Sequence, residues 1–219
     1  MRLRENEIVL FQGDSITDGN RGRNLDPNHV MGHGYQFIVG ARLHADNLDR
    51  HIQTFNRGVS GNRVADLYGR WLEDTINLRP TLLSILIGVN DAWFDWSSSS
   101  GSNPARFEKI YRLLLDEALE SCPGLRLVLM EPFTGGWFED ETRGRFMRER
   151  VGALQPVVRA LAGEYGAAFV PLQAMFDEYS RLVPAKELIW DGVHPTITGH
   201  ELIARQWLGC VQARFGDAE

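Results

Sequence analysis

Residues 8–18 read Ile-Val-Leu-Phe-Gln-Gly-Asp-Ser-Ile-Thr-Asp, and the rest of the chain repeats the pattern that they begin. The first four residues are apolar and predict a β-strand. Gly13 and Asp14 end the apolar run, so that Ser15 stands where a strand passes into a helix. At such a turn a hydroxyl projects from the end of the sheet. Its backbone N–H also lies near the free donors of a helix N-terminus.

Four further apolar runs predict strands at residues 51–56, 82–87, 125–130 and 167–170. Between them, apolar residues recur at helical spacing, which predicts helices with one buried face. The stripes are Val64, Leu67, Tyr68, Trp71 and Leu72; Phe107, Ile110, Tyr111, Leu114, Leu115 and Ala118; Met147, Val151, Leu154, Val158 and Leu161; and Ile203, Trp207, Val211 and Phe215. Alternating strands and helices predict a mostly parallel α/β sheet with helices on both faces. We expect one domain over residues 1–219.

Polar residues follow the first three predicted strands directly. They are Gly13-Asp14-Ser15, residues 56–62 and residues 88–91. In a parallel sheet, the functional loops follow the carboxyl ends of the strands. We therefore expect these three segments to meet at one edge of the sheet and to form a site.

Ser15 has two interpretations. A serine at the start of a helix commonly caps the helix, because its hydroxyl accepts a backbone N–H. The alternative is a catalytic nucleophile, which needs a base to take the hydroxyl proton. The surrounding residues are not the Gly-x-Ser-x-Gly turn of the α/β-hydrolases, since position 17 is threonine.

His194 is the histidine with the most informative context among the six in the chain. It lies in Trp190-Asp191-Gly192-Val193-His194-Pro195, three residues after Asp191. In a tight turn the carboxylate reaches Nδ1 of the imidazole and leaves Nε2 free to face a serine. The alternative is an aspartate that caps the last helix beside an incidental histidine. If the first interpretation holds, Ser15, His194 and Asp191 form a catalytic triad.

Three groups are candidates to stabilise the oxyanion of an acyl transfer: the N–H of Ser15, the N–H of Gly61 and the side-chain amide of Asn90. Glycine lets the backbone approach a substrate closely. Asn90 follows the apolar strand 82–87 directly. Turn chemistry is the alternative for both Gly61 and Asn90, because Gly and Asn are common in turns.

Taken together, these residues resemble the four sequence blocks of the SGNH hydrolase superfamily, also called GDSL esterases and lipases. Ser15 matches the first block, Gly61 the second, Asn90 the third, and Asp191 with His194 the last. Ile16 replaces the leucine of the eponymous motif. The resemblance implies a three-layer α/β/α sandwich of flavodoxin-like character with five parallel strands. It also implies that no metal and no cofactor is needed.

Further stretches resemble a bacterial branch of the superfamily that includes acetylxylan esterases acting on xylo-oligosaccharides. They are residues 13–18, 58–62, 66–67, 70–71, 87–93 and 190–195. This resemblance implies an acetylated sugar as substrate. A lysophospholipase or thioesterase acting on longer acyl chains has the same triad and is the alternative. We find no long apolar lid and no amphipathic surface helix, which disfavours a lipase acting on lipid droplets.

Several residues in or near the predicted site loops are candidates to bind the substrate, since aromatic faces suit sugar rings. They are Asp14, Tyr35, Arg63, Trp93, Trp96, Trp137 and Trp190. The aromatic residues can equally pack the loops or form a contact between copies in a homo-oligomer.

Composition excludes several other classes of function. The net charge is −6, which argues against a nucleic acid partner and against adsorption to an anionic membrane. Phosphate-loop and dinucleotide-binding glycine motifs are absent from the sequence. A binding protein without catalytic activity on the same fold is a further alternative.

No signal-like segment and no run of ~18 apolar residues occurs, so we expect a cytoplasmic protein with Cys122 and Cys210 reduced.

Overall fold

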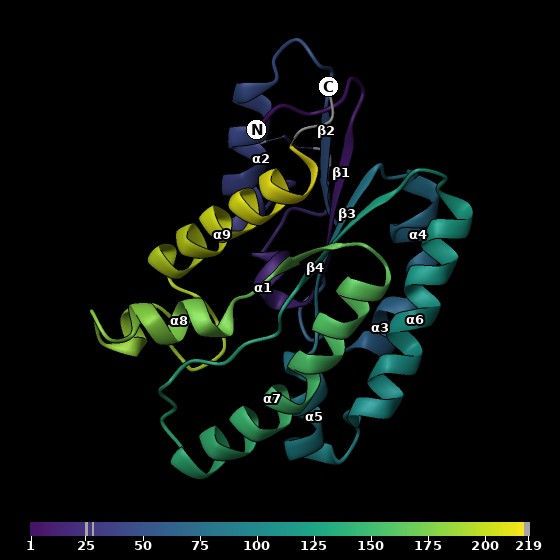
Figure 1. Ribbon diagram of the computed structural model, residues 1–219. Helices are drawn as coiled ribbons and strands as arrows, with labels where there is room; N and C mark the ends of the chain where they lie inside the picture. The colour runs from purple at the N-terminus through teal and green to yellow at the C-terminus, as the bar shows by residue number, and fades with distance from the viewer. Residues whose placement is uncertain (25, 28, 217–219) are drawn as a thin grey trace.

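A five-stranded parallel sheet forms the centre of the computed structural model, which describes residues 1–216 except 25 and 28 (Figure 1). The strands are β1 (Ile8–Gly13), β2 (Gln53–Asn56), β3 (Leu82–Leu86), β4 (Arg126–Met130) and β5 (Ala168–Val170). Their order across the sheet is β2-β1-β3-β4-β5, and every neighbouring pair is parallel. This is the flavodoxin-like order of a doubly wound sheet. The five predicted strands are therefore confirmed.

The central strands are apolar at successive positions because both faces of the sheet are covered. Every residue of β3 is buried. Side chains alternate between the two faces of a strand. Accordingly, Leu82 and Leu86 belong to one core, whereas Leu83 and Ile85 belong to the other. A continuous apolar run is the expected signature of such a strand.

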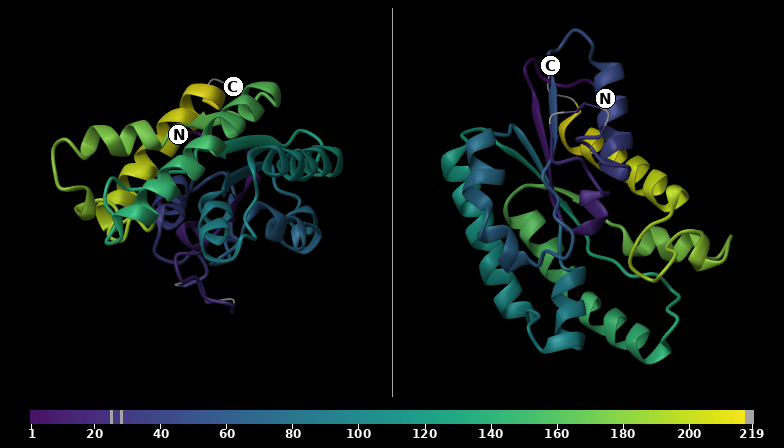
Figure 2. Two further views of the ribbon diagram at one scale, coloured as in Figure 1. Left: turned by 90° about the horizontal axis from the view of Figure 1, so that it is seen from below. Right: turned by 180° about the vertical axis from the view of Figure 1, so that it is seen from behind.

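Helices cover both faces of the sheet, and Figure 2 shows α9 and α6 on opposite sides of it. One core packs beneath α2 (Tyr35–Asp46), α8 (Gln173–Tyr179) and α9 (Ile197–Phe215). The other packs beneath α3 (Val64–Tyr68), α4 (Trp71–Asp74) and α6 (Pro104–Ser121). The long α7 (Glu141–Glu164) contributes to both cores. The remaining helices are α1 (Ser15–Asp18), α5 (Val89–Ser98) and two 3₁₀ turns, Ile76–Leu78 and Ala185–Glu187. The three-layer sandwich is thus confirmed.

The predicted stripe at residues 64–72 is wrong as a description of one continuous helix. Gly69 separates α3 from α4, and glycine is a poor helix former because its backbone loses the most freedom on ordering. Beyond this break Leu72 faces solvent, and Tyr68 just before it is also exposed. Val64, Leu67 and Trp71 are buried as expected. Of the remaining helices, α2, α5 and α8 are additional to the stripes expected from the sequence.

No helix in the described part of the chain has both the length and the apolar character needed to cross a lipid bilayer.

Candidate active site

Ser15 is the first residue of α1, directly after β1. The turn between them needs glycine at position 13, where an added Cβ would lie 2.3 Å from the carbonyl oxygen of Leu86. Asp14 caps α1, since its Oδ1 accepts the N–H of Ile16 at 3.0 Å. The cap of this helix is thus Asp14 and not Ser15. The serine hydroxyl is left free for another partner.

That partner is the imidazole of His194. Ser15 Oγ lies 2.9 Å from His194 Nε2, and His194 Nδ1 lies 2.7 Å from Asp191 Oδ2. The other carboxylate oxygen, Asp191 Oδ1, accepts the backbone N–H groups of Val193 at 2.9 Å and His194 at 2.7 Å. The structure therefore brings the three residues, from the two ends of the chain, into one hydrogen-bonded line.

The loop that carries His194 is closed at its base. Trp190 N–H donates to the His194 carbonyl at 3.0 Å, and Ile189 pairs with Pro195 in an antiparallel bridge. Thr196 then caps α9 with its side chain. The cap of the last helix is thus Thr196, which leaves the Asp191 carboxylate to hold the histidine.

Hydrogen bonding sets the charge state of this pair. The hydrogen bond that His194 Nδ1–H donates to Asp191 raises the pKa of His194 and outweighs the opposing effect of partial burial. Burial works to raise the pKa of Asp191, but the hydrogen bonds that it accepts from the ring and backbone of His194 and from Val193 lower it below its ordinary value. Asp191 is therefore ionised at neutral pH and stabilises a protonated imidazole.

The three predicted oxyanion donors come from the carboxyl ends of β1, β2 and β3. Among the described residues, neither the N–H of Ser15 nor that of Gly61 has a hydrogen-bond acceptor. Gly61 has φ of +82°, and a Cβ there would meet nothing within 4 Å, so its backbone borders open space. The Asn90 amide Nδ2 donates to the Asn62 carbonyl at 3.1 Å, which holds the side chain beside this loop.

Two buried side chains that the sequence did not single out for this role hold the Gly61 loop to α1. Asn56 Nδ2 donates to the carbonyls of Thr17 at 2.7 Å and Asp18 at 3.1 Å. Asp18 Oδ2 accepts both the backbone N–H and the hydroxyl of Ser60, at 2.9 and 3.1 Å. Asn56 is the last residue of β2 and Asp18 is the last residue of α1, so their nearness to the carboxyl ends of strands was the only signal in the sequence that could have found them.

Asp14 and Asp91 are buried carboxyl groups behind the site. Burial raises the pKa of Asp14 to about 7 and that of Asp91 to about 6. Asp91 Oδ2 accepts the N–H of Val64 at the start of α3. The prediction that Asp14 binds the substrate is wrong, because the residue is 1% exposed and its carboxyl points into the protein.

A cavity of about 260 Å³ opens at Ser15 and His194. Its other lining residues are Ile16, Gly19, Asn20, His33, Trp190, Pro195 and His200. Trp190 is 60% exposed, and its ring stacks on the His194 ring with centroids 6.2 Å apart. The predicted place of Trp190 beside the site is therefore seen in the structure. His33 and His200 were missed, since nothing in their local sequence distinguishes them.

Five other predicted substrate-binding residues lie elsewhere. Tyr35 is a correction: it is fully buried, with its hydroxyl 3.0 Å from Thr17 Oγ1, because it packs α2 onto the sheet. In the described part of the chain, the remaining four do not line the Ser15 cavity. Arg63 pairs with Asp66, Trp96 packs on Phe146, Trp93 lies beneath the guanidinium of Arg143, and Trp137 lines a separate hollow.

The described residues hold no group of three or more His, Cys, Asp or Glu side chains arranged to bind a metal ion.

Residues 11–202 match the model of the GDSL-like lipase/acylhydrolase family. The chain belongs to this family. It is 35% identical to an acetylxylan esterase of Geobacillus stearothermophilus, over 95% of each protein. As a family member with such a relative, it is a carboxylic ester hydrolase.

Solved structures of family members share the fold over nearly their whole length. A Parabacteroides merdae protein assigned as a GDSL-like lipase superposes with a TM-score of 0.89 at 34% identity, over 95% of this chain and 97% of that one. Axe2, an acetylxylan esterase from Geobacillus stearothermophilus, superposes with a TM-score of 0.84 at 33% identity, over 96% of each chain. The chain thus has relatives that share its fold from end to end with few unmatched residues.

Proposed function

We propose that this GDSL hydrolase removes acetyl groups from carbohydrates such as xylo-oligosaccharides, with Ser15 as nucleophile, His194 as general base and Asp191 as the group that orients the imidazole. The observation that carries the proposal is the line of hydrogen bonds from Ser15 Oγ to His194 Nε2 and from His194 Nδ1 to Asp191. This geometry is what a serine needs to become a nucleophile at neutral pH.

The reaction has two half-reactions. His194 Nε2 takes the proton of Ser15 as Oγ attacks the ester carbonyl, and the N–H groups of Ser15 and Gly61 with the Asn90 amide stabilise the oxyanion. The carbon–oxygen bond to the sugar then breaks, and His194 returns the proton to the departing alcohol. Water then attacks the acetyl-enzyme as His194 takes its proton, and His194 returns this proton to Ser15 Oγ when the bond to the acetyl group breaks and acetate leaves.

Two observations favour a short acyl group and a sugar. The cavity at Ser15 measures about 260 Å³, which is small for a ligand site. The exposed Trp190 ring borders it and offers a flat apolar face. The relatives point the same way, because Axe2 is an acetylxylan esterase, and two of its structures are catalytic mutants in which a serine or an aspartate is replaced by alanine.

The test is acetate release from acetylated xylo-oligosaccharides, measured by mass spectrometry for the wild type and for Ser15→Ala. We expect release by the wild type only, and equal release by both proteins would contradict the assigned nucleophile. p-Nitrophenyl esters of increasing acyl length test the acyl specificity. Activity should collapse beyond acetyl or propionyl, whereas activity that improves toward octanoyl would favour a lysophospholipase or thioesterase.

A further inference from the structure

A second hollow, of about 510 Å³, lies beside the cavity at Ser15. This hollow is lined by Asn20, His29, Gly32, His33, Phe37, Ile38 and Ile197. Asn20 and His33 also line the Ser15 cavity. The two hollows therefore adjoin at Asn20 and His33, and we call them together the groove, which borders the N-terminal ends of α2 and α9.

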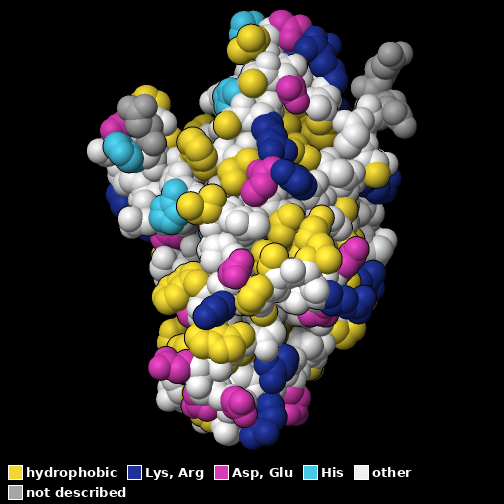
Figure 3. Space-filling view, turned by 90° about the vertical axis from the view of Figure 1, so that its left-hand side faces the viewer, with side chains coloured by type: hydrophobic (Ala, Val, Ile, Leu, Met, Phe, Trp, Pro, Cys, Tyr) yellow, Lys and Arg dark blue, Asp and Glu magenta, His cyan; other side chains and the backbone are white. Residues whose placement is uncertain are grey.

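Three of the residues that line the second hollow are large and apolar, and two of these three are open to solvent. Ile197 is 90% exposed and Phe37 is 46% exposed. Single exposed apolar residues are common on protein surfaces, but these two belong to distant parts of the chain and face the same hollow together with Ile38. In Figure 3, which faces this side of the molecule, histidine and hydrophobic side chains lie next to one another.

The position of the groove relative to His194 decides which part of an ester it can hold. His194 must give its proton to the leaving oxygen, so the alcohol lies on the His194 side of Ser15. Ile197, the first residue of α9, follows His194 by three residues along the chain. Gly61 lies instead in the loop before α3, and Asn90 lies in the first turn of α5. The groove therefore extends away from Ser15 on the side of the alcohol.

We propose that the Phe37–Ile197 shelf, formed by Asn20, His33, Phe37, Ile38 and Ile197, is the subsite for the alcohol part of the substrate, and that it binds the sugar ring next to the acetylated residue. A pyranose has an apolar C–H face and a polar rim of hydroxyls. The rings and aliphatic groups of the shelf match the face, and Asn20 and His33 match the rim. This assignment rests on the proposed carbohydrate esterase function.

Two acetates that share the acyl group and differ in the alcohol test the shelf. We would measure kcat/KM for ethyl acetate and for acetylated xylotriose with the wild type, Phe37→Ser and Ile197→Ser. On acetylated xylotriose each variant should lose about fivefold to tenfold, mainly through KM, because apolar contact area is removed from bound sugar. On ethyl acetate, which does not reach the shelf, each variant should equal the wild type. Thermal melting checks that both variants are folded.

Leu48→Ser is the matched control. Leu48 is 86% exposed and lies just beyond the C-terminal end of α2, whereas the shelf lies at its N-terminal end. The kcat/KM of this control should equal that of the wild type on both substrates.

Several results would overturn the shelf assignment while leaving the esterase intact. Equal changes on both acetates, or no change on either, would show that the shelf does not bind the alcohol. A loss confined to p-nitrophenyl octanoate relative to p-nitrophenyl acetate would place the acyl chain there instead. If light scattering gave the variants a lower particle mass than the wild type while their substrate preference stayed unchanged, the shelf would be a contact between copies of the chain. If the wild type cleaves ethyl acetate but not acetylated xylotriose, the carbohydrate function itself fails, and the shelf assignment fails with it.

Discussion

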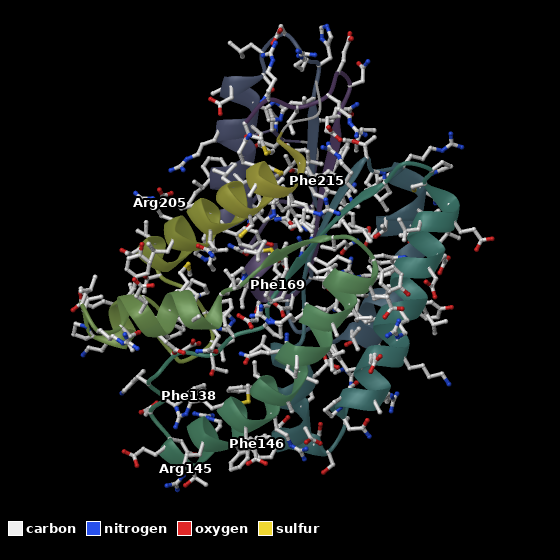
Figure 4. All side chains as sticks on the ribbon, viewed as in Figure 1. Phe138, Arg145, Phe146, Phe169, Arg205 and Phe215 are labelled. Atoms are coloured by element: carbon white, nitrogen blue, oxygen red, sulfur yellow. The ribbon has the colours of Figure 1, made fainter. Side chains whose placement is uncertain are left out.

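The ring of Phe138 packs directly on the backbone of Gly192. A Cβ at position 192 would lie 2.6 Å from Cε1 of Phe138, and one at Gly144 in α7 would lie 2.9 Å from the same side chain. Gly135 N–H also donates to the Gly192 carbonyl at 2.7 Å. Phe138, labelled in Figure 4, is 5% exposed and belongs to the segment between β4 and α7. The loop that carries Asp191 and His194 is thus held in place by a ring from another part of the chain.

Phe138→Ala should lower kcat by about tenfold to a hundredfold with a smaller effect on KM, because a displaced imidazole loses its alignment with Ser15. The free energy of unfolding should fall by roughly 3–5 kcal/mol from the cavity left behind. Steady-state kinetics and urea unfolding measure the two effects. Phe138→Leu should recover most of the activity. Phe146→Ala is the control, since Phe146 packs on Trp96, and an equal loss of kcat in this variant would argue against a positioning role for Phe138.

Asp191→Asn should shift the pH dependence of kcat/KM as well as lower the rate. His194 acts as a base only when neutral, so activity should fall as pH decreases through its pKa, which Asp191 raises above 6.5. Without the carboxylate the acid limb should move to lower pH. The rate at the plateau should fall by roughly 10⁴-fold, because the amide no longer stabilises the imidazolium. A pH–rate profile from pH 5 to about 9 measures both, and an unmoved acid limb would show that another group controls it.

Asn90→Ala should lower kcat by about 10²–10³-fold while KM changes little, since an oxyanion donor acts mainly in the transition state. Asn90→Asp makes the matched comparison, because it keeps the size of the side chain and replaces the amide donor by an acceptor. It should be at least as inactive as the alanine variant. A variant of either kind that retained wild-type kcat would remove Asn90 from the proposed mechanism.

His200 should make the fold less stable in acid. Its Nδ1 accepts the N–H of Tyr35 at 3.1 Å, and burial lowers the pKa of the imidazole to about 4. Between pH 6.5 and 4 the unfolded chain therefore binds a proton that the folded protein excludes, so stability falls as the pH falls through this window. This contribution is fully present above pH 6.5.

Replacing His200 by Asn keeps an acceptor near the Tyr35 N–H and removes the titration. The loss of unfolding free energy between pH 7 and pH 4.5 should then be smaller by roughly 2 kcal/mol than in the wild type. Urea unfolding at the two pH values gives the change in unfolding free energy for each protein. Subtracting the change in the variant from that in the wild type cancels the contributions of the other titrating groups. Parallel pH dependence in both proteins would mean that His200 takes up its proton without unfolding.

Local sequence was enough to predict the strands, most of the helical stripes and the three residues that meet in the hydrogen-bonded line from Ser15 to Asp191. The strands could be predicted because a doubly covered strand must be apolar at successive positions. Asp191 and His194 could be paired because they are three residues apart on one loop. The site residues were visible because they stand in polar segments directly after apolar strands, where a parallel sheet gathers its functional loops.

Tertiary packing decided which of the candidate side chains face the site. Tyr35, Trp93, Trp96 and Trp137 are aromatic residues of the kind expected near a sugar site. Yet Tyr35 is buried, Trp93 and Trp96 contact side chains of α7, and Trp137 lines a separate hollow. The direction of a side chain from a loop depends on neighbours that are distant in sequence, as Phe138 is from Gly192. For the same reason, no local sequence pattern predicted that Phe37 and Ile197 line the same hollow. The order and spacing of residues along the chain thus determined which side chains could meet at Ser15, and the packing of separate helices determined the surface around them.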